Sequence, residues 1–548
     1  MSGLKVVEPK VMVLPAPAQP LQALTHLDLS DCSELQSVPE WVGTLPVLRF
    51  LFLSRCSAAT TLPGQLPATL VMLDASEMAA LTALPEHTLP AQLQSLSLAC
   101  SSLSVLPASM GSLVALQFLS LSGCNHLVGL PAALGNCRAL RHLDLSGCQR
   151  LTALPESLGQ CTALEYLSVQ DCKLLTALPN AIGQLTALRT LKAWCSRLQG
   201  MPASVGQCTS LTLLDICAKE LTALPASLGN LSGLTCLLLA GCSKQLRELP
   251  ERLFVGATAL TQLDLSHCQQ LTSLPSSLGC LGALHTLTLD QCESLQGLPS
   301  TTGQLRSLRT LSLKTCSALT SLPEGAFSAE MVALEVLDLS ECRSLTSLPE
   351  SATVLPRLRE LNLMWCVALT ALPETIGRLR TLEDLQLALA SGLTRLPDSL
   401  GQLHSLRSLD IRRLHQVTQL PSTIGKLHSL TSLVLSSCSA LTALPESSGQ
   451  LPLERLAMAD LPALTHLPRS LARVTTLWGC FGLQGEHKRV MDALLRANTG
   501  LRLHRVRQLV LVLTGRRFMR YSLPPELWAL VDTALIDADP TRHSYLAS

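Results

Sequence analysis

The sequence predicts an α/β solenoid of about 20 coils, whose short strands form one parallel β-sheet on the concave side of a horseshoe, followed by a helical C-terminal cap. A leucine pattern returns, usually every 23 or 24 residues, from Leu24 to Leu453. Hydrophobic residues make up 47% of the chain and aromatic residues only 3%, so leucine must build the core. Such a sustained period favours one elongated domain over the several that 548 residues would otherwise suggest.

One coil is illustrated by residues 140–159, LRHLDLSGCQRLTALPESLG. Leu143 and Leu145 alternate with polar residues, as in a strand with one buried face, and Leu151 begins the returning arm. Pro155 prevents the strand from continuing. A single coil cannot bury its own leucines, but stacked coils share a continuous core with their strands about 4.8 Å apart.

Three segments follow from this pattern: a proline-containing N-terminal segment (1–20), the solenoid (21–477) and a helical, basic cap or tail (478–548). The formal net charge is +1, so no global field attracts nucleic acid, anionic lipid or an acidic substrate. The first segment has no continuous apolar run, and no other run reaches the roughly 18 residues of a membrane span. We therefore expect a cytoplasmic protein.

The chain contains 21 cysteines but no Cys-x-x-Cys pair, which favours reduced thiols over disulfides or a zinc ribbon. Twelve cysteines fall eight residues after the first leucine of their coil: Cys32, Cys56, Cys124, Cys148, Cys172, Cys242, Cys268, Cys292, Cys316, Cys342, Cys366 and Cys438. At this bend we expect a small side chain that bonds weakly to the backbone of the next coil. Cys137, Cys161 and Cys208 replace a convex-side leucine and are predicted to pack in the core.

The consensus LxxLxLSxCxxLxxLPExLGxLxxL resembles the leucine-rich repeat. It is similar to the leucine-rich regions of plant-type intracellular disease-resistance proteins and of cytoplasmic signalling scaffolds. The resemblance implies a concave strand and a helical or irregular convex segment in each coil, with cysteine at the family's Asn/Cys position. It also implies a non-catalytic scaffold or recognition protein in signalling or defence. No Gly-x-x-x-x-Gly-Lys-Ser/Thr motif is present, so the nucleotide switch of resistance receptors is not expected.

Residues between the strand leucines are predicted to face the concave solvent. The column that includes Asp144 is mostly small or acidic, and none of its aspartates occupy adjacent coils. Neighbouring carboxylates are then about 10 Å apart or more, too far to share a metal ion. We expect no metal, cofactor, catalytic residue or small-molecule substrate.

We expect a partner to dock where large aromatic or arginine side chains interrupt the small and acidic residues of the concave face, because such side chains dominate binding energies. One predicted protein-binding cluster comprises Tyr166, Arg189, Lys192 and Trp194. A second comprises Glu360, Asn362, Met364, Trp365, Arg407, Arg412 and Arg413. The alternative is that the two tryptophans fill gaps where the repeat has drifted. Phe50, Phe52 and Phe118 form either a third contact or a cover for an exposed edge.

After Trp478 the leucine pattern ends, and helical segments at 486–497 and 504–520 are predicted to cap the last coil. Residues 485–520 carry nine Lys or Arg against Glu486 and Asp492. A basic amphipathic stretch can touch RNA or anionic lipid. Because no aromatic series interleaves with the arginines, a solvated face or a site for an acidic protein is favoured.

The tail ends in a stretch, 523–531, that resembles the first helix of an F-box, whose pattern begins Leu-Pro-x-Glu-Leu. The resemblance implies docking to a ubiquitin-ligase adaptor, and the matching residues are Leu523, Pro524, Glu526, Leu527 and Trp528. The alternative function is therefore substrate recognition for a ubiquitin ligase. An enzyme is not expected, because no known catalytic motif or separate catalytic domain is present.

Overall fold

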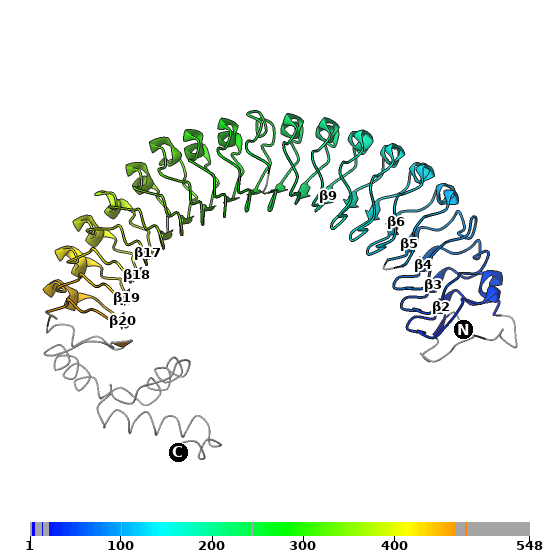
Figure 1. The fold of residues 1–548 in the computed structure, drawn as a ribbon, viewed down its shortest axis with the longest axis horizontal. Helices are drawn as coiled ribbons and strands as arrows, with labels where there is room; N and C mark the ends of the chain where they lie inside the picture. The colour runs from blue at the N-terminus through cyan, green and yellow to red at the C-terminus, as the bar shows by residue number, and fades with distance from the viewer. Residues whose placement is uncertain are drawn as a thin grey trace, which may run out of the picture. The chain divides into compact units, whose positions relative to one another are not determined.

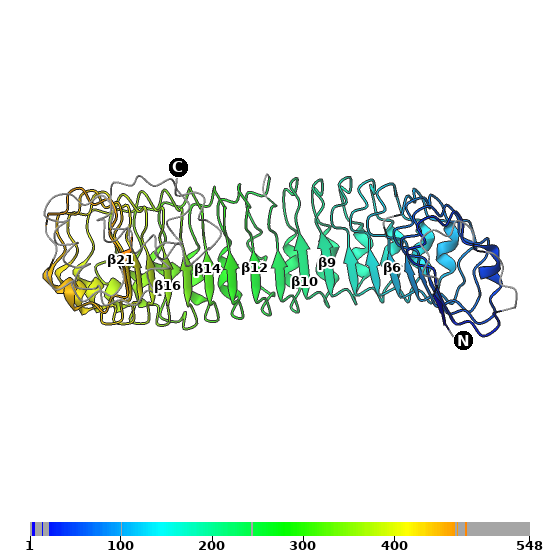
Figure 2. The same ribbon diagram turned by 90° about the horizontal axis from the view of Figure 1, so that it is seen from below.

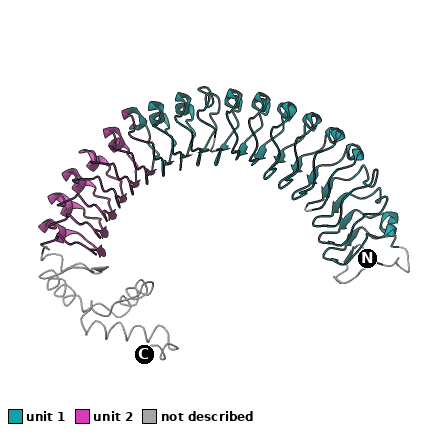
Figure 3. Cartoon of the chain, in the orientation of Figure 1, with its two compact units in different colours: residues 1–317, 325–334 teal, residues 318–324, 335–548 magenta. Residues whose placement is uncertain are grey.

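A computed structural model describes residues 3–5, 14, 21–99, 101–242, 245–465, 468 and 477–478 (Figure 1). The chain divides into two compact units (Figure 3), with unit 1 formed by residues 1–317 and 325–334 and unit 2 by residues 318–324 and 335–548. The predicted cap helices at 486–497 and 504–520 lie outside the described residues, so the helical cap stays a prediction. The three segment boundaries also stay predictions.

Strands β1 to β14 form the sheet of unit 1, and each pairs in parallel with the next. Their bounds are β1 Gly3–Lys5, β2 His26–Asp28, β3 Phe50–Phe52, β4 Met72–Asp74, β5 Ser95–Ser97, β6 Phe118–Ser120, β7 His142–Asp144, β8 Tyr166–Ser168, β9 Thr190–Ala193, β10 Leu213–Ile216, β11 Cys236–Leu238, β12 Gln262–Asp264, β13 Thr286–Thr288 and β14 Thr310–Ser312. In Figure 3 these strands line the inner side of the curve of unit 1.

Unit 2 repeats this architecture with strands β15 to β21, again paired in parallel and in chain order. Their bounds are β15 Val336–Asp338, β16 Glu360–Asn362, β17 Asp384–Gln386, β18 Ser408–Asp410, β19 Ser432–Val434, β20 Arg455–Ala457 and β21 Leu477–Trp478. Figure 2 shows the strands within each unit lying side by side. The predicted solenoid with one parallel strand per coil is therefore confirmed.

The strands form where leucines alternate with polar residues. In β7 the middle residue, Leu143, is fully buried, whereas His142 and Asp144 on either side are half-buried and face the opposite way. The register is regular, because His142 pairs with Tyr166 and Asp144 with Ser168. Equivalent residues of successive coils therefore lie next to one another and form columns along the sheet.

The convex side carries short 3-10 turns where the consensus implied a helical or irregular segment. They are η1 Glu40–Thr44, η2 Ala108–Ser112, η3 Ala132–Asn136, η4 Glu156–Gln160, η5 Asn180–Gln184, η6 Ala203–Gln207, η7 Ala226–Asn230, η8 Ser276–Cys280, η9 Ser300–Gln304, η10 Glu324–Ala326, η11 Glu350–Val354, η12 Ile376–Arg378, η13 Asp398–Gln402, η14 Ser422–Lys426 and η15 Glu446–Gln450. Most follow a proline such as Pro155, whose φ of −70° suits the start of a turn. Within the described ranges no helix is long and apolar enough to cross a membrane.

The glutamate of the Leu-Pro-Glu motif joins one coil to the next. The carboxylate of Glu156 accepts hydrogen bonds from the backbone N–H groups of Asn180 and Ala181, at 3.0 and 2.8 Å. Glu86 does the same for Ala108 and Ser109. These N–H groups open a 3-10 turn and have no partner inside it, so the preceding coil supplies their cap.

The glycine in the second-to-last position of most turns allows the coils to pack closely. A Cβ atom added to Gly159 would lie 2.6 Å from the carbonyl oxygen of Ala181 in the next coil. At Gly401 in unit 2 the corresponding distance, to the oxygen of Thr423, is 2.4 Å. Both are shorter than a carbon and an oxygen can approach, so this position requires glycine for space.

The cysteines form a buried ladder, as the sequence predicts, but they bond to the preceding coil and not to the next. The Sγ of Cys148 donates to the carbonyl oxygen of Leu121, at 3.2 Å, and Cys172 donates to Leu145 in the same way. Cys195 lies one residue closer to the first leucine of its coil than the other cysteines of the ladder do, so the fixed spacing did not identify it. Its Sγ donates to the carbonyl oxygen of Val169, at 3.1 Å. Burial raises the pKa of the Cys195 thiol to about 12. These thiols are structural.

A residue with positive φ precedes the cysteine position in most coils, such as Asp171, whose φ is 57°. The coils of β9 and β10 have no such residue: their strands are four residues long, and Cys195 and Ala218 occupy the buried position one residue early. Without the left-handed residue the strand continues further before it turns inward. Trp194 lies at this altered bend.

Candidate protein-binding face

Two columns of side chains face away from the core on each sheet, at the first and third positions of the strands. The third position, where the sequence shows mostly small or acidic residues, includes Asp144, Ser168 and Lys192. The first position, directly before the buried middle leucine, proves more distinctive in unit 1. From β2 to β8 it carries His26, Phe50, Met72, Ser95, Phe118, His142 and Tyr166.

Three of these rings stack on consecutive strands, and we call Phe118, His142 and Tyr166 the aromatic ladder. The ring centres of Phe118 and His142 are 4.6 Å apart with planes 14° from parallel. Those of His142 and Tyr166 are 4.2 Å apart and 3° from parallel. Phe118 remains 36% exposed, so the stack is open to a partner. His142 was not a predicted contact, although its place before Leu143 is visible in the sequence.

The histidine at the centre of the aromatic ladder binds a proton less readily than a free imidazole does. Burial between its neighbours lowers the pKa of His142, and the carboxylate of Asp144 offsets this only in part. Beside the ladder, the guanidinium of Arg141 and the carboxylate of Glu165 form an ion pair across the same two coils. The ladder is thus an apolar ridge bordered by a paired charge.

A shorter stack lies at the start of the same column. The rings of His26 and Phe50 are 4.4 Å apart and 16° from parallel, and the guanidinium of Arg49 lies 5.8 Å from the centre of the Phe50 ring. Phe52, at the third position of β3, is half-buried. Phe50 and Phe52 therefore both lie on the concave side of the sheet, in the first and third columns, and each is half-buried.

The first predicted cluster is brought together on β8 and β9. Tyr166 ends the aromatic ladder, Arg189 is exposed directly before β9, and Lys192 is half-buried within β9. Trp194 is 44% exposed, and its indole Nε1 donates to Oδ1 of Asp215 on β10, at 2.6 Å. Sequence reasoning missed this bond, because it joins residues of different coils.

Asp215 is itself only 8% exposed. Burial raises its pKa, while the hydrogen bond from Trp194 and the charge of Lys192 act in the opposite direction. The bond holds the indole in place and leaves part of the ring facing solvent. Trp194 therefore lies in the altered bend and is still accessible to solvent. Filling a gap where the repeat has drifted and contacting a partner are compatible roles for this residue.

The second predicted cluster, in unit 2, is more dispersed. Glu360 and Asn362 are the first and third residues of β16, whereas Met364 and Trp365 lie in the turn that follows it. Trp365 has a positive φ of 64° and is 38% exposed. The guanidinium of Arg343 lies 5.7 Å from the centre of a Trp365 ring. This tryptophan therefore belongs to the bend and not to the strand.

The three arginines of this cluster have different surroundings. Arg407 lies 3.6 Å from the carboxylate of Glu383. Arg412 pairs with Asp410 at 2.7 Å, and burial raises the pKa of Asp410 against the effect of this partner. Arg413 occupies the left-handed position, with φ of 59°. The structure therefore places Arg407 before β18 and the other two arginines after it, and not in one patch with Trp365.

The concave aspartates have a local structural role. Oδ1 of Asp144 accepts the backbone N–H and the hydroxyl of Ser146, at 2.9 and 2.6 Å. Asp74 does the same for Ser76. These bonds fix the bend after the strand. In the part of the chain that the structure describes, no three potential metal ligands are grouped.

The adaptor-binding residues predicted in the tail, Leu523, Pro524, Glu526, Leu527 and Trp528, lie outside the described residues. Their role stays a prediction.

Sequence models of known protein families match three parts of the chain. A model described as "Leucine-rich repeat region" matches residues 126–253, and two models described as "Leucine rich repeat" match 306–367 and 259–281. This chain is a leucine-rich repeat protein. No curated protein sequence is significantly similar to it.

One solved leucine-rich repeat structure shares the fold of this chain, and two further structures match it at lower TM-scores. A leucine-rich repeat protein of Leptospira interrogans is 27% identical, with a TM-score of 0.51, over 73% of this chain and 94% of that one. A plant peptide hormone receptor, RGFR1 in complex with RGF2, is 23% identical with a TM-score of 0.47, over 84% and 78% of the two chains. The Arabidopsis receptor kinase HAESA, in complex with the peptide hormone IDA and a co-receptor, is 21% identical with a TM-score of 0.42, over 83% and 86%.

Proposed function

We propose that this protein is a non-catalytic recognition scaffold that binds a protein partner on the concave face of unit 1. The observation that carries the proposal is the aromatic ladder of Phe118, His142 and Tyr166, which is stacked and partly exposed, with the exposed Trp194 in the next coil. Only 3% of the chain is aromatic, so this concentration departs from its composition. The leucine-rich repeat fold supports a protein-interaction role.

Energetics favour this face. Aromatic side chains already held in place lose little conformational entropy on binding and supply large apolar contact areas. Stacking holds the rings of the aromatic ladder, and the bond to Asp215 holds Trp194. A partner would therefore meet a rigid apolar ridge with charged residues, Arg189 and Lys192, at one end.

Photocrosslinking tests the location. A photoreactive phenylalanine analogue at Tyr166 should capture a partner from native cell extract, whereas the same analogue at Thr286, the first position of β13, should not. Equal capture at both positions would contradict a specific role for the aromatic ladder.

Affinity for the captured partner then tests the energetics. The double variant Phe118→Ala/Tyr166→Ala should weaken binding at least about tenfold, equivalent to about 1.4 kcal/mol. Val105→Ala/Val114→Ala is the matched control, because both valines are 60% exposed and lie outside the ladder. Circular dichroism should show that both double variants keep the wild-type fold.

A role of this protein in signalling or defence would follow from the identity of the partner.

We propose that this protein is located in the cytoplasm. Buried free thiols such as Cys148, Cys172 and Cys292 support a reducing compartment. A fluorescent fusion would show the location directly. Secretion of the fusion into the medium would contradict it.

The alternative is a substrate-recognition subunit of a ubiquitin ligase, supported by the F-box-like residues 523–531. A chain that ends at Tyr521 should then lose ligase-adaptor proteins in affinity capture while it retains the partner of the aromatic ladder. Retention of the adaptor by the shortened chain would exclude this function for the tail.

A further inference from the structure

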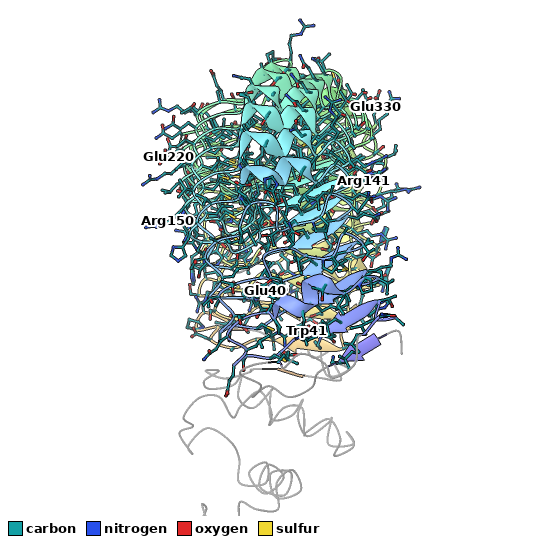
Figure 4. The ribbon with its side chains drawn as sticks, turned by 90° about the vertical axis from the view of Figure 1, so that its right-hand side faces the viewer. Glu40, Trp41, Arg141, Arg150, Glu220 and Glu330 are labelled. Atoms are coloured by element: carbon teal, nitrogen blue, oxygen red, sulfur yellow. The ribbon has the colours of Figure 1, made fainter. Side chains whose placement is uncertain are left out.

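A strip of basic side chains lies on one flank of unit 2, on the segments that lead into strands β16 to β19. Figure 4 identifies this flank in unit 1, where Arg141 and Glu330 lie on one side of the stack and Arg150 and Glu220 on the other. The coil positions of Glu330 and Arg141, together with the short stretch between them, carry in unit 2 the residues Arg357, Arg359, Arg378, Arg380, His404, Arg407, Lys426 and His428, which we call the basic flank. All eight side chains are exposed.

Most of this charge is not neutralised. Arg359 and Arg407 share the carboxylate of Glu383, at 3.4 and 3.6 Å. The other four cations, Arg357, Arg378, Arg380 and Lys426, make no ion pair with any residue that the structure describes. The rings of His404 and His428 lie parallel, with centres 6.5 Å apart, which shows how closely one coil follows the next along the strip.

The strip is not inherited from the repeat. At the coil position of Arg378 and Lys426, unit 2 also has Gln402, and unit 1 mostly has neutral side chains, among them Asn136, Gln160, Gln184, Gln207 and Asn230. Where unit 2 has Arg380, unit 1 has two comparable arginines, Arg138 and Arg306, and the guanidinium of Arg306 is already bound to Glu330 at 2.8 and 3.1 Å. The basic flank is therefore a local concentration of cations and not a feature that every coil repeats.

We propose that the basic flank binds an acidic, extended polypeptide segment. The protein itself shows that one coil step brings an arginine and a carboxylate into contact, because Arg306 pairs with Glu330 and Arg395 with Glu374, at 2.8 Å, between neighbouring coils. An extended chain with carboxylates on alternate residues presents one about every 6.8 Å. It can therefore meet successive cations of the strip, and guanidinium groups bind carboxylates through two hydrogen bonds.

Charge distribution favours a short acidic segment over a long polyanion. Between residues 335 and 465 the chain has 11 Lys or Arg and 13 Asp or Glu, a net charge of −2. Nucleic acids and anionic membranes respond to a field spread over many charges, which residues 335–465 do not provide. A peptide that contacts only the basic flank experiences mainly the local cations, because distant charges are screened beyond about 10 Å.

A defined peptide tests the proposal. The probe is a fluorescein-labelled peptide of alternating glutamate and serine, with an alternating glutamine and serine peptide as its neutral counterpart, titrated by fluorescence anisotropy with the full chain. The flank variant is Arg378→Glu/Arg380→Glu/Lys426→Glu. The matched control, Arg150→Glu/Arg197→Glu/Lys219→Glu, has the same change in net charge, at exposed residues of the opposite flank of unit 1.

The acidic peptide should bind the wild-type chain and lose at least about tenfold in affinity with the flank variant, but less than about twofold with the control. The basic tail is the same in all three proteins, so its contribution cancels. Equal losses in both variants, or no binding to the wild type, would overturn the proposal. An oligonucleotide, or a phosphatidylserine vesicle, that bound the flank more tightly than the peptide would also overturn it.

Discussion

Units 1 and 2 use the same coil but present different concave surfaces. The first strand position of unit 1 carries His26, Phe50, Met72, Ser95, Phe118, His142 and Tyr166 along β2 to β8. In unit 2 it carries Val336, Glu360, Asp384, Ser408, Ser432 and Arg455 along β15 to β20. The buried leucines and the strand register are the same in both. The backbone is therefore fixed by residues that a partner never touches, while the exposed columns are free to differ.

Loss of a core leucine should have the largest effect, and it should be equal in the two units. Leu167→Ala in β8 and Leu385→Ala in β17 each remove a fully buried side chain, and each should cost about 3 kcal/mol of local stability. Hydrogen exchange read coil by coil would measure both costs. A difference of more than about 1 kcal/mol would show that the two cores are packed differently.

Filling the glycine position should cost somewhat less. Gly159→Ala and Gly401→Ala place a Cβ atom 2.6 and 2.4 Å from a carbonyl oxygen of the next coil, so we expect a loss of about 1 to 3 kcal/mol for each in chemical denaturation. Gly282→Ala is the control, because its Cβ would meet no atom within 4 Å. A control as destabilised as the two variants would refute the packing argument.

Buried aspartates at the third strand position should give both units the same weak pH dependence. Burial raises the folded-state pKa of Asp215 and of Asp410, so each folded carboxyl holds its proton more tightly than the unfolded one does. Their favourable contribution is then complete below the unfolded pKa, near 3.9, and is lost as pH rises through the folded pKa.

Relative to the wild type, Asp215→Asn and Asp410→Asn should therefore each become more stable between pH 4 and pH 7, within about 1 kcal/mol. Denaturation midpoints of each variant and the wild type at the two pH values measure this change. A change of opposite sign in one unit would show that its partner, Trp194 or Arg412, outweighs burial.

Exposed ion pairs between coils should have the smallest effect. Arg306→Ala in unit 1 and Arg395→Ala in unit 2 remove pairs whose arginines are 70% and 71% exposed, so each should change stability by no more than about 0.5 kcal/mol. Thermal unfolding at low and high salt would detect a larger contribution. A loss above about 1 kcal/mol would mean that these pairs hold the coils together.

The sequence predicts the periodic features of this fold well, because each depends on residues within one coil. Alternation around Leu143 predicts the strand, and Pro155 correctly predicts where the coil changes direction. The pattern does not show whether the convex segment is a helix or a 3-10 turn, and it does not show the close approach of Gly159 to the next coil, which depends on how coils stack.

The candidate face was only partly predictable, since it depends on contacts between coils. Tyr166 and Trp194 were found as departures from the consensus, but stacking with His142 and the bond to Asp215 require the register of neighbouring strands. Cys195 was missed because the coil of β9 has no left-handed residue, which shifts the buried position by one. A fixed count from the first leucine of a coil therefore misplaces the buried position when the coil has one residue fewer before its bend.

The reactivity of the buried cysteines can show which coils of this protein open during unfolding. Each thiol, such as Cys148 or Cys366, is fully buried in its own coil and bonded to the preceding one. A thiol reagent can therefore reach a given cysteine only after that coil opens. Pulse alkylation followed by mass spectrometry would time the opening of individual coils in the unmodified chain, with no engineered label.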